Sequence, residues 1–171
     1  MGDPGDAATS RGPASREGTD VNKTLTRERE NLFRAIDAVL QAVEPGQLRA
    51  VAYLRVSTEE QRKGYGIAYT GKRVARHIAK KGWALVDIFA DEGVSGTLDH
   101  HQRPDLKELL ALARQTPRPF DVVCVYEERA IGRRDKAFWP WVWKLEDEYG
   151  IFTAVVKGDY DNTTDDGRRG M

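Results

Sequence analysis

The chain of 171 residues is long enough for one domain of ordinary size with extensions. Its 27 basic and 27 acidic residues give a formal net charge of zero, which excludes a bulk electrostatic attraction to nucleic acid, so any anion site must be local. The single cysteine, Cys124, lies in an apolar run and offers neither an internal disulfide nor a metal cluster. No segment has the character of a membrane span or a signal peptide, and we expect a cytoplasmic protein.

The N-terminal region is predicted to lie outside the main domain. Residues 1–20 are rich in Gly, Pro, Ala, Ser and charge, a composition typical of a disordered tail. Within residues 21–46, apolar side chains recur at helical spacing from about Thr26 to Val43, and the pattern ends at Pro45-Gly46. This amphipathic helix would pack either on the following domain or on a second copy of the chain. Its apolar stripe consists of Leu32, Phe33, Ile36, Val39, Leu40 and Val43.

From residue 47 to residue 171, strand patterns alternate with helix patterns. Such an alternation predicts an α/β fold with a mostly parallel sheet of four to five strands and helices on both faces. Ligand sites in sheets of this kind lie beyond the carboxyl ends of the strands. The predicted strands are 49–56, 83–90, 120–126 and 151–156, and the predicted helices are 68–81, one beginning at Pro104, and 135–149.

An arginine and a serine stand at the end of the first predicted strand. Residues two apart in an extended segment point to the same side, so Arg55 and Ser57 would place a nucleophile beside a cation. Alternatively, the arginine bonds a loop carbonyl and the serine caps the next turn. Three further stretches bring arginine or glycine to the same edge of the sheet: 91–96, Arg103 and 128–134.

Several stretches in order resemble one protein family. These are YLRVSTEEQ, FADEGVSGT, QRPDLKELL, FDVVCVYEERAIGR and DNTTDDGRRGM. Together they resemble the catalytic domain of the serine recombinases, the resolvase/invertase family, over roughly residues 49–171. The resemblance implies site-specific recombination of duplex DNA by subunits that assemble into dimers or tetramers. It implies no cofactor, no membrane and no small-molecule substrate.

The resemblance also implies roles for individual residues. Ser57 matches the nucleophile that attacks a DNA phosphodiester and becomes joined to the 5′ phosphate, and Gln61 matches a glutamine that supports the site. Asp91 matches an acidic residue at the end of the second strand. Arginine suits the remaining positions because guanidinium groups make paired, charge-assisted hydrogen bonds to phosphate oxygens. Those positions are Arg55, Arg103 and Arg133.

The loop after the third strand departs from the family pattern. An ungapped match places Arg129 at the expected acidic position and Ala130 at the first catalytic arginine. A shift by one residue would make Arg129 that arginine, so Arg129 remains a candidate site residue. We prefer the ungapped match, because it keeps Tyr126, Gly132 and Arg133 in register.

Other readings of the chain remain open. The sequence ends at GRRGM, where the family's long dimerisation helix begins, so we expect a truncated catalytic domain without a DNA-binding domain; the alternative is an impaired remnant that acts only in protein interactions. A flavodoxin-like ligand-binding domain would need a glycine-rich loop after the first strand, which is absent. Asp91, Glu92 and Asp99 could bind a divalent metal, but solvated acids are common in such loops, and we predict no metal. For the aromatic run at residues 138–143, we favour packing or a protein interface over base stacking.

Overall fold

The structure is a computed structural model that describes residues 30–36, 41–64, 66–92, 103–158 and 160–163. Among these residues, five strands form a single sheet in the order β2-β1-β3-β4-β5. The first four strands are parallel, and the last is antiparallel to its neighbour. The predicted α/β fold with a mostly parallel sheet is therefore confirmed. The strands are β1 (Arg49–Val56), β2 (Ala84–Glu92), β3 (Val122–Val125), β4 (Phe152–Val155) and β5 (Tyr160–Asp161).

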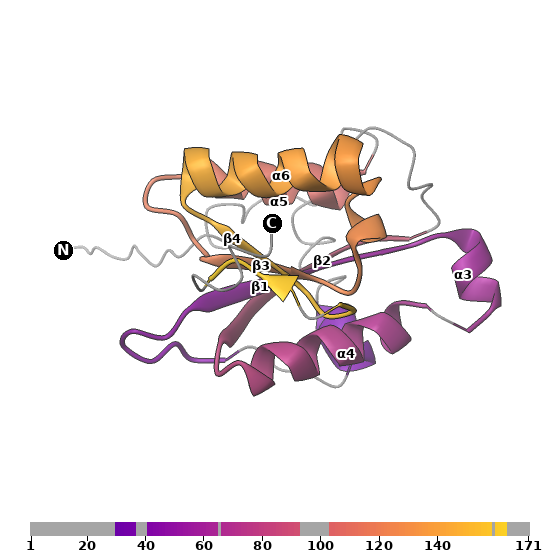
Figure 1. The fold of residues 1–171 in the computed structure, drawn as a ribbon. Coiled ribbons are helices and arrows are strands. Elements are labelled where there is room, and N and C mark those ends of the chain that lie inside the picture. Colours follow the sequence, from indigo (N-terminus) through magenta and orange to yellow (C-terminus); the bar gives the residue numbers. More distant parts are fainter. Residues whose placement is uncertain (1–29, 37–40, 65, 93–102, 159, 164–171) are drawn as a thin grey trace, which may run out of the picture.

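Helices cover both faces of the sheet (Figure 1). α4 (Ile67–Lys80) lies on one face, and α5 (Pro104–Ala113) and α6 (Trp139–Lys144) lie on the other. α6 continues at both ends into π-helical turns, so residues 134–149 form one helical segment, which ends at Gly150 with a φ of 67°. This agrees with the helices predicted from the sequence.

Two short elements follow the strands that matter most for the site. α3 (Thr58–Arg62) begins directly after β1, and a 3₁₀ turn (Glu128–Ala130) follows β3. Both elements lie at the carboxyl edge of the parallel sheet. In the described part of the chain, no helix combines the length and the apolar character needed to cross a membrane.

The strands alternate between two apolar cores. Val51 and Tyr53 of β1 pack with the α5 and α6 side, whereas Ala52 and Leu54 pack with the α4 side. This alternation follows from the two-residue period of an extended chain. β3 is buried along its whole length, including Cys124, and burial raises the pKa of this thiol. The cysteine is a small apolar residue of the core.

The described part of the N-terminal segment packs on this domain. Residues 30–35 are helical, and Ile36 is only 2% exposed in the core beneath α4. Leu32 and Phe33 pack against the same core. Gly71 of α4 makes this packing possible, because a Cβ at that position would clash with the side chain of Ile36. The sequence left open whether the apolar stripe packs on the following domain or on a second copy of the chain. For Leu32, Phe33 and Ile36, the structure shows packing on the chain's own domain.

The predicted end of the N-terminal helix was wrong. Residues 41–44 are not helical, and the side chain of Val43 is 43% exposed. Gln41 instead pairs with the start of β2, since its Oε1 accepts a hydrogen bond from Leu85 N at 3.0 Å. The backbone N–H of Gln41 also donates to the oxygen of Leu85 at 3.3 Å, so it bonds a distant strand and not a helical carbonyl. The other predicted stripe residues, Val39 and Leu40, and the predicted tail at 1–20 lie outside the described residues.

The aromatic run on α6 is divided between the core and the surface. Phe138 is fully buried, and Trp141 is 8% exposed. Trp143 is 50% exposed, and its ring stacks on Trp139 with 6.3 Å between ring centroids. The run therefore serves mainly in packing and leaves one exposed indole.

Candidate active site

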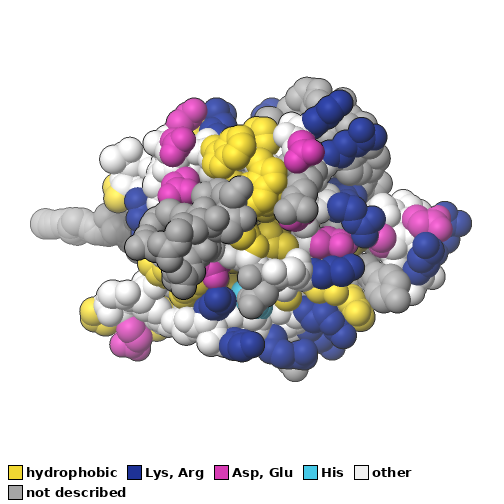
Figure 2. Space-filling model, viewed as in Figure 1, with side chains coloured by type: hydrophobic (Ala, Val, Ile, Leu, Met, Phe, Trp, Pro, Cys, Tyr) yellow, Lys and Arg dark blue, Asp and Glu magenta, His cyan; other side chains and the backbone are white. Residues whose placement is uncertain are grey.

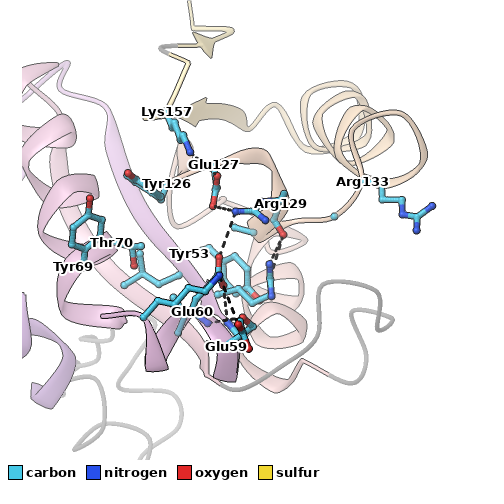
Figure 3. Close-up of a pocket in the computed structure, with 17 residues that line it drawn as sticks. Tyr53, Glu59, Glu60, Tyr69, Thr70, Tyr126, Glu127, Arg129, Arg133 and Lys157 are labelled. Atoms are coloured by element: carbon cyan, nitrogen blue, oxygen red, sulfur yellow. Dashed lines mark hydrogen bonds and ion pairs between the residues drawn. The ribbon is translucent and has the colours of Figure 1, made fainter. Parts of the chain in front are cut away.

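A pocket of about 760 Å³ opens at the carboxyl edge of the sheet (Figure 3). Arg55 and Ser57 reach it from the end of β1, Glu127 and Arg129 from the loop after β3, and Lys157 from the end of β4. Parallel strands place their carboxyl ends at one edge, so segments far apart in the sequence meet there. The predicted meeting of Arg55 and Ser57 is present in the structure.

Ser57 is held at the N-terminus of α3 by a reciprocal pair of hydrogen bonds. Its Oγ accepts a hydrogen bond from Glu60 N at 3.1 Å, and its own N–H donates to Glu60 Oε1 at 2.8 Å. This is a capping box, in which two backbone donors of the first turn are satisfied by side chains. The serine is therefore a helix cap, and the residue also lines the pocket.

Two arginines donate to consecutive carbonyl oxygens of the loop after β3. Arg55 donates to the oxygen of Arg129, from Nε at 3.2 Å and from Nη2 at 2.9 Å. Arg103, which is 1% exposed, donates from Nη1 to the oxygen of Ala130 at 2.8 Å. Burial, and then the positive charge of Arg103, lowers the pKa of Arg55. A half-buried Arg55 beside a buried Arg103 creates a local preference for an anion.

Asp91 contributes to the architecture around the pocket. It is 4% exposed and accepts three hydrogen bonds: from Tyr53 Oη at 2.7 Å, Asp105 N at 3.0 Å and Leu106 N at 3.1 Å. The last two are orphan donors at the start of α5, which an acceptor must satisfy when they are buried. Burial, and then the charge of Asp91, raises the pKa of Tyr53. Asp91 thus ties β1, β2 and α5 together.

The loop after β3 presents Arg129 to the pocket. Arg129 Nη2 lies 2.9 Å from Glu127 Oε2 and 3.6 Å from Glu60 Oε2, and the hydrogen bond to Glu127, followed by its charge, raises the pKa of Arg129. The side chain of Ala130 is 4% exposed and belongs to the apolar core. Arg133 lies at the rim and points away from the other labelled side chains (Figure 3).

The predicted site residues therefore fall into two groups. Arg55, Ser57, Arg129 and Arg133 line the pocket. Among the described residues, Gln61, Asp91 and Arg103 are outside its lining. Gln61 is exposed on α3, while Asp91 and Arg103 are buried and bond to the lining residues Tyr53 and Ala130.

Comparison with known proteins decides the family. The family described as Resolvase, N terminal domain, matches residues 50–170. The chain belongs to the resolvase family. No significant match was found among curated proteins.

Two solved structures resemble this resolvase-family domain. The N-terminal catalytic domain of TP901-1 integrase is similar with a TM-score of 0.59 and 21% identity, over 71% of this chain and 88% of that one. A resolvase family site-specific recombinase from Streptococcus pneumoniae is similar with a TM-score of 0.57 and 19% identity, over 70% of this chain and 78% of that one. At these identities the likeness establishes the fold.

Some residues of the pocket were not identified from the sequence. Glu60 could have been, because serine followed three residues later by glutamate is the capping-box pattern. Glu127 and Lys157 stand two residues after the ends of β3 and β4, so the rule for strand ends also points to them. They form an ion pair, with Lys157 Nζ 3.5 Å from Glu127 Oε1. Tyr69 lines the pocket from α4 and carried no sequence signal.

Asp91, Glu92 and Asp99 are the acidic residues that could bind a metal according to the sequence. In the described ranges, no three His, Cys, Asp or Glu side chains are grouped as metal ligands. Asp91 uses its oxygens for the three hydrogen bonds given above, and Asp99 lies outside the described residues.

Proposed function

We propose that this resolvase-family domain cleaves and rejoins strands of duplex DNA, with Ser57 as the nucleophile. The observation that carries the proposal is the meeting of a pocket-lining serine with Arg55 and Arg129 at the carboxyl edge of the sheet. The hydroxyl is anchored by the capping box, so its position is restrained before a ligand arrives. A restrained nucleophile beside cations suits attack on a phosphodiester.

In the proposed step, Ser57 Oγ forms a bond to the phosphorus of a DNA phosphodiester. The bond from phosphorus to the 3′ oxygen breaks, the 3′ oxygen takes up a proton, and the hydroxyl of Ser57 gives up its proton to solvent. The product is a phosphoserine diester to the 5′ end and a free 3′ hydroxyl. Because one phosphodiester replaces another, a 3′ hydroxyl can reverse the reaction and seal a strand without an external energy source.

The arginines would stabilise the negative charge that gathers on the non-bridging oxygens. Arg55 is held by the carbonyl of Arg129, so its guanidinium is oriented in advance. Arg129 is paired with Glu127, and a phosphate would have to compete with that carboxylate. Arg103 would act through the loop, because it donates to the carbonyl oxygen of Ala130. We propose that Arg133 contributes from the rim and Gln61 from α3, and that further subunits of the same family complete the assembly on DNA.

A covalent adduct provides the test. The chain would be fused to a sequence-specific DNA-binding module and incubated with duplexes nicked at successive positions beside the module's site. Cleavage near a nick releases a short fragment, which dissociates, so the strand cannot be resealed. We expect an adduct that survives denaturation and a DNA phosphate on Ser57 in mass spectrometry. Ser57→Ala should abolish the adduct, while Thr58→Ala, the neighbouring hydroxyl, should retain it. Equal adduct yield from Ser57→Ala would reject the serine as nucleophile.

A second candidate function is protein interaction without catalysis. It is favoured by the half-exposed indole of Trp143 stacked on Trp139, an arrangement common in protein interfaces. In that case the adduct would be absent, and Trp143→Ser would change the mass measured by sedimentation. A fusion that forms the Ser57 adduct would exclude a purely noncatalytic role.

A further inference from the structure

The exposed side of α4 is basic from Lys72 to Lys80. The helix spans 14 residues and contains no Asp or Glu. With 3.6 residues per turn, its four lysine and arginine residues and Tyr69 fall within an arc of about 100°, opposite the buried side of the helix. We define the α4 basic face as Lys72, Arg73, Arg76 and Lys80. Figure 2 shows lysine and arginine side chains gathered along the lower edge of the molecule, over α4.

These cations have no acidic partners in the described part of the chain. Several cations elsewhere are paired, for example Arg49 with Asp121, Lys81 with Asp161, and Arg129 with Glu127. None of the four residues of the α4 basic face forms such an ion pair among the described residues. Solvated helix faces usually mix both signs, because pairs three or four residues apart stabilise the helix. A chain with zero net charge has therefore concentrated unpaired cations on one helix.

The α4 basic face begins at the wall of the pocket. The guanidinium of Arg73 lies over the ring of Tyr69, 3.6 Å from its centroid, and donates to the carbonyl oxygen of Tyr69 at 3.0 Å. Tyr69 lines the pocket and meets Tyr126 edge to face, with 6.2 Å between ring centroids. Arg73 is thus held against a pocket residue, and the other cations lead away from the pocket along the helix.

We propose that the α4 basic face binds the sugar-phosphate backbone of duplex DNA beside the phosphodiester that enters the pocket. The inference rests on the proposed function for the identity of the ligand in the pocket. From Tyr69 to Lys80 the helix rises about 16 Å, and one DNA strand carries a phosphate every 3.4 Å or so of axis, so several phosphates come within reach of flexible side chains. Contacts to phosphate position a duplex without reading its sequence.

Salt dependence measures the number of cations that meet phosphate. The chain of residues 1–171 would be titrated with a fluorescent 30-base-pair duplex of random sequence from 20 to 200 mM salt. Each neutralised phosphate contributes about 0.9 to the slope of log K against log salt. Replacing three members of the α4 basic face should reduce the slope by roughly 2.7 and weaken binding about tenfold or more at 50 mM salt. The variant is Lys72→Gln/Arg76→Gln/Lys80→Gln.

A matched control removes the same charge from the other side of the sheet. Lys107 and Arg114 at α5 and Lys144 of α6 are exposed, and Lys107→Gln/Arg114→Gln/Lys144→Gln should keep the slope of the unmodified chain. Equal losses in the two triple variants would overturn the proposal, because binding would then depend on charge without regard to place. No binding by the unmodified chain at 20 mM salt would also overturn it, as would face-dependent binding to phosphatidylserine vesicles that exceeds binding to the duplex at equal anion concentration.

A crosslink locates the contact. Cys124 is the only cysteine in the sequence and is fully buried, so a cysteine introduced by Arg76→Cys can be labelled selectively with a photocrosslinker. Crosslinks to the duplex are expected from this position and not from Lys107→Cys. The two proposals can fail separately. If an adduct forms on Ser57 but the two triple variants lose binding equally, only the proposed DNA contact of the α4 basic face is rejected. Face-dependent binding without any adduct rejects only the proposed chemistry.

Discussion

The guanidinium of Arg55 is fixed on the carbonyl oxygen of Arg129, with Nε at 3.2 Å and Nη2 at 2.9 Å. The contact joins the end of β1 to the loop after β3 across 74 positions of sequence. The side chain of Arg55, which could bind a phosphate, thus also holds the backbone of Arg129, another arginine of the pocket. The position of the loop and the orientation of the cation therefore depend on each other.

Arg55→Lys should impair strand cleavage although it keeps the charge. An ammonium group cannot reproduce the two-nitrogen contact in a fixed plane. Loss of a preorganised donor typically costs about a hundred- to a thousandfold in rate, and we expect a decrease of that size in adduct formation. The control is Arg62→Lys on α3, whose side chain is exposed, and it should retain the rate. A rate unchanged by Arg55→Lys would show that the planar contact has no part in cleavage.

Arg129→Ala should slow adduct formation at least as much as Arg133→Ala, because Arg129 reaches into the pocket whereas Arg133 points away. Ala130→Arg should lower the melting temperature, since the side chain of Ala130 is 4% exposed in the apolar core and a buried charge is costly. Because Ala130 is buried in the core, we expect Arg129 to serve as the arginine of this loop. This expectation differs from the ungapped match that we prefer from the sequence alone. Faster cleavage by a stable Ala130→Arg variant would restore that match.

Asp91→Ala should destabilise the domain by about 3 kcal/mol, because it leaves buried donors of Tyr53, Asp105 and Leu106 without their acceptor. Tyr53→Phe removes one donor and should cost about 1 kcal/mol. Urea unfolding measures both. A variant of unchanged stability that no longer forms the adduct would instead place Asp91 in the chemistry.

Gly71→Ala should release the N-terminal segment from α4, despite the better helix propensity of alanine, because the new Cβ would clash with Ile36. We expect a lower melting temperature and faster hydrogen exchange in residues 30–36. Combining Gly71→Ala with Ile36→Ala should cost less than the sum of the two single changes. Strict additivity in this cycle would mean that the two residues are not in contact in solution.

The ion pair that joins the starts of β1 and β3 should make stability depend on pH. Asp121 accepts hydrogen bonds from Arg49 N at 2.8 Å and Arg49 Nε at 3.0 Å. Burial alone would raise the pKa of Asp121, but these hydrogen bonds outweigh it and lower the pKa. The folded pKa is then below the unfolded value of about 3.9, so the contribution is complete above that pH and is lost as pH falls through the folded pKa.

Asp121→Asn should therefore lower the free energy of unfolding at pH 7 by about 1–3 kcal/mol, with a difference from the unmodified chain that shrinks toward pH 3. Urea midpoints at pH 7, 5 and 3 provide the measurement. Glu59→Gln, at an exposed pair with Arg62, should show almost no effect at any pH. A constant difference for Asp121→Asn across this range would contradict a charge-dependent role.

The four parallel strands, the helices α4, α5 and α6, and the facing of Arg55 and Ser57 could be predicted from the sequence, whereas α3 and β5 were not predicted. β1 was predicted with the bounds that it has, 49–56, because its apolar run and the two-residue period of a strand are local properties of the backbone. The same period places Arg55 and Ser57 on one side, and the rule for strand ends places both at the pocket.

Only the tertiary structure decided which contacts each arginine makes and how exposed it is. Arg129 and Ala130 both line the pocket, but only Arg129 is exposed, because the backbone of this 3₁₀ turn is held by Arg55 and Arg103 from other elements. The end of the N-terminal helix could not be predicted from the sequence either, because Gln41 pairs with Leu85 of β2 instead of continuing the helical pattern. Adjacent residues in a turn have nearly equal local preferences, so contacts made across the fold determine which one is buried and which one is exposed at the pocket.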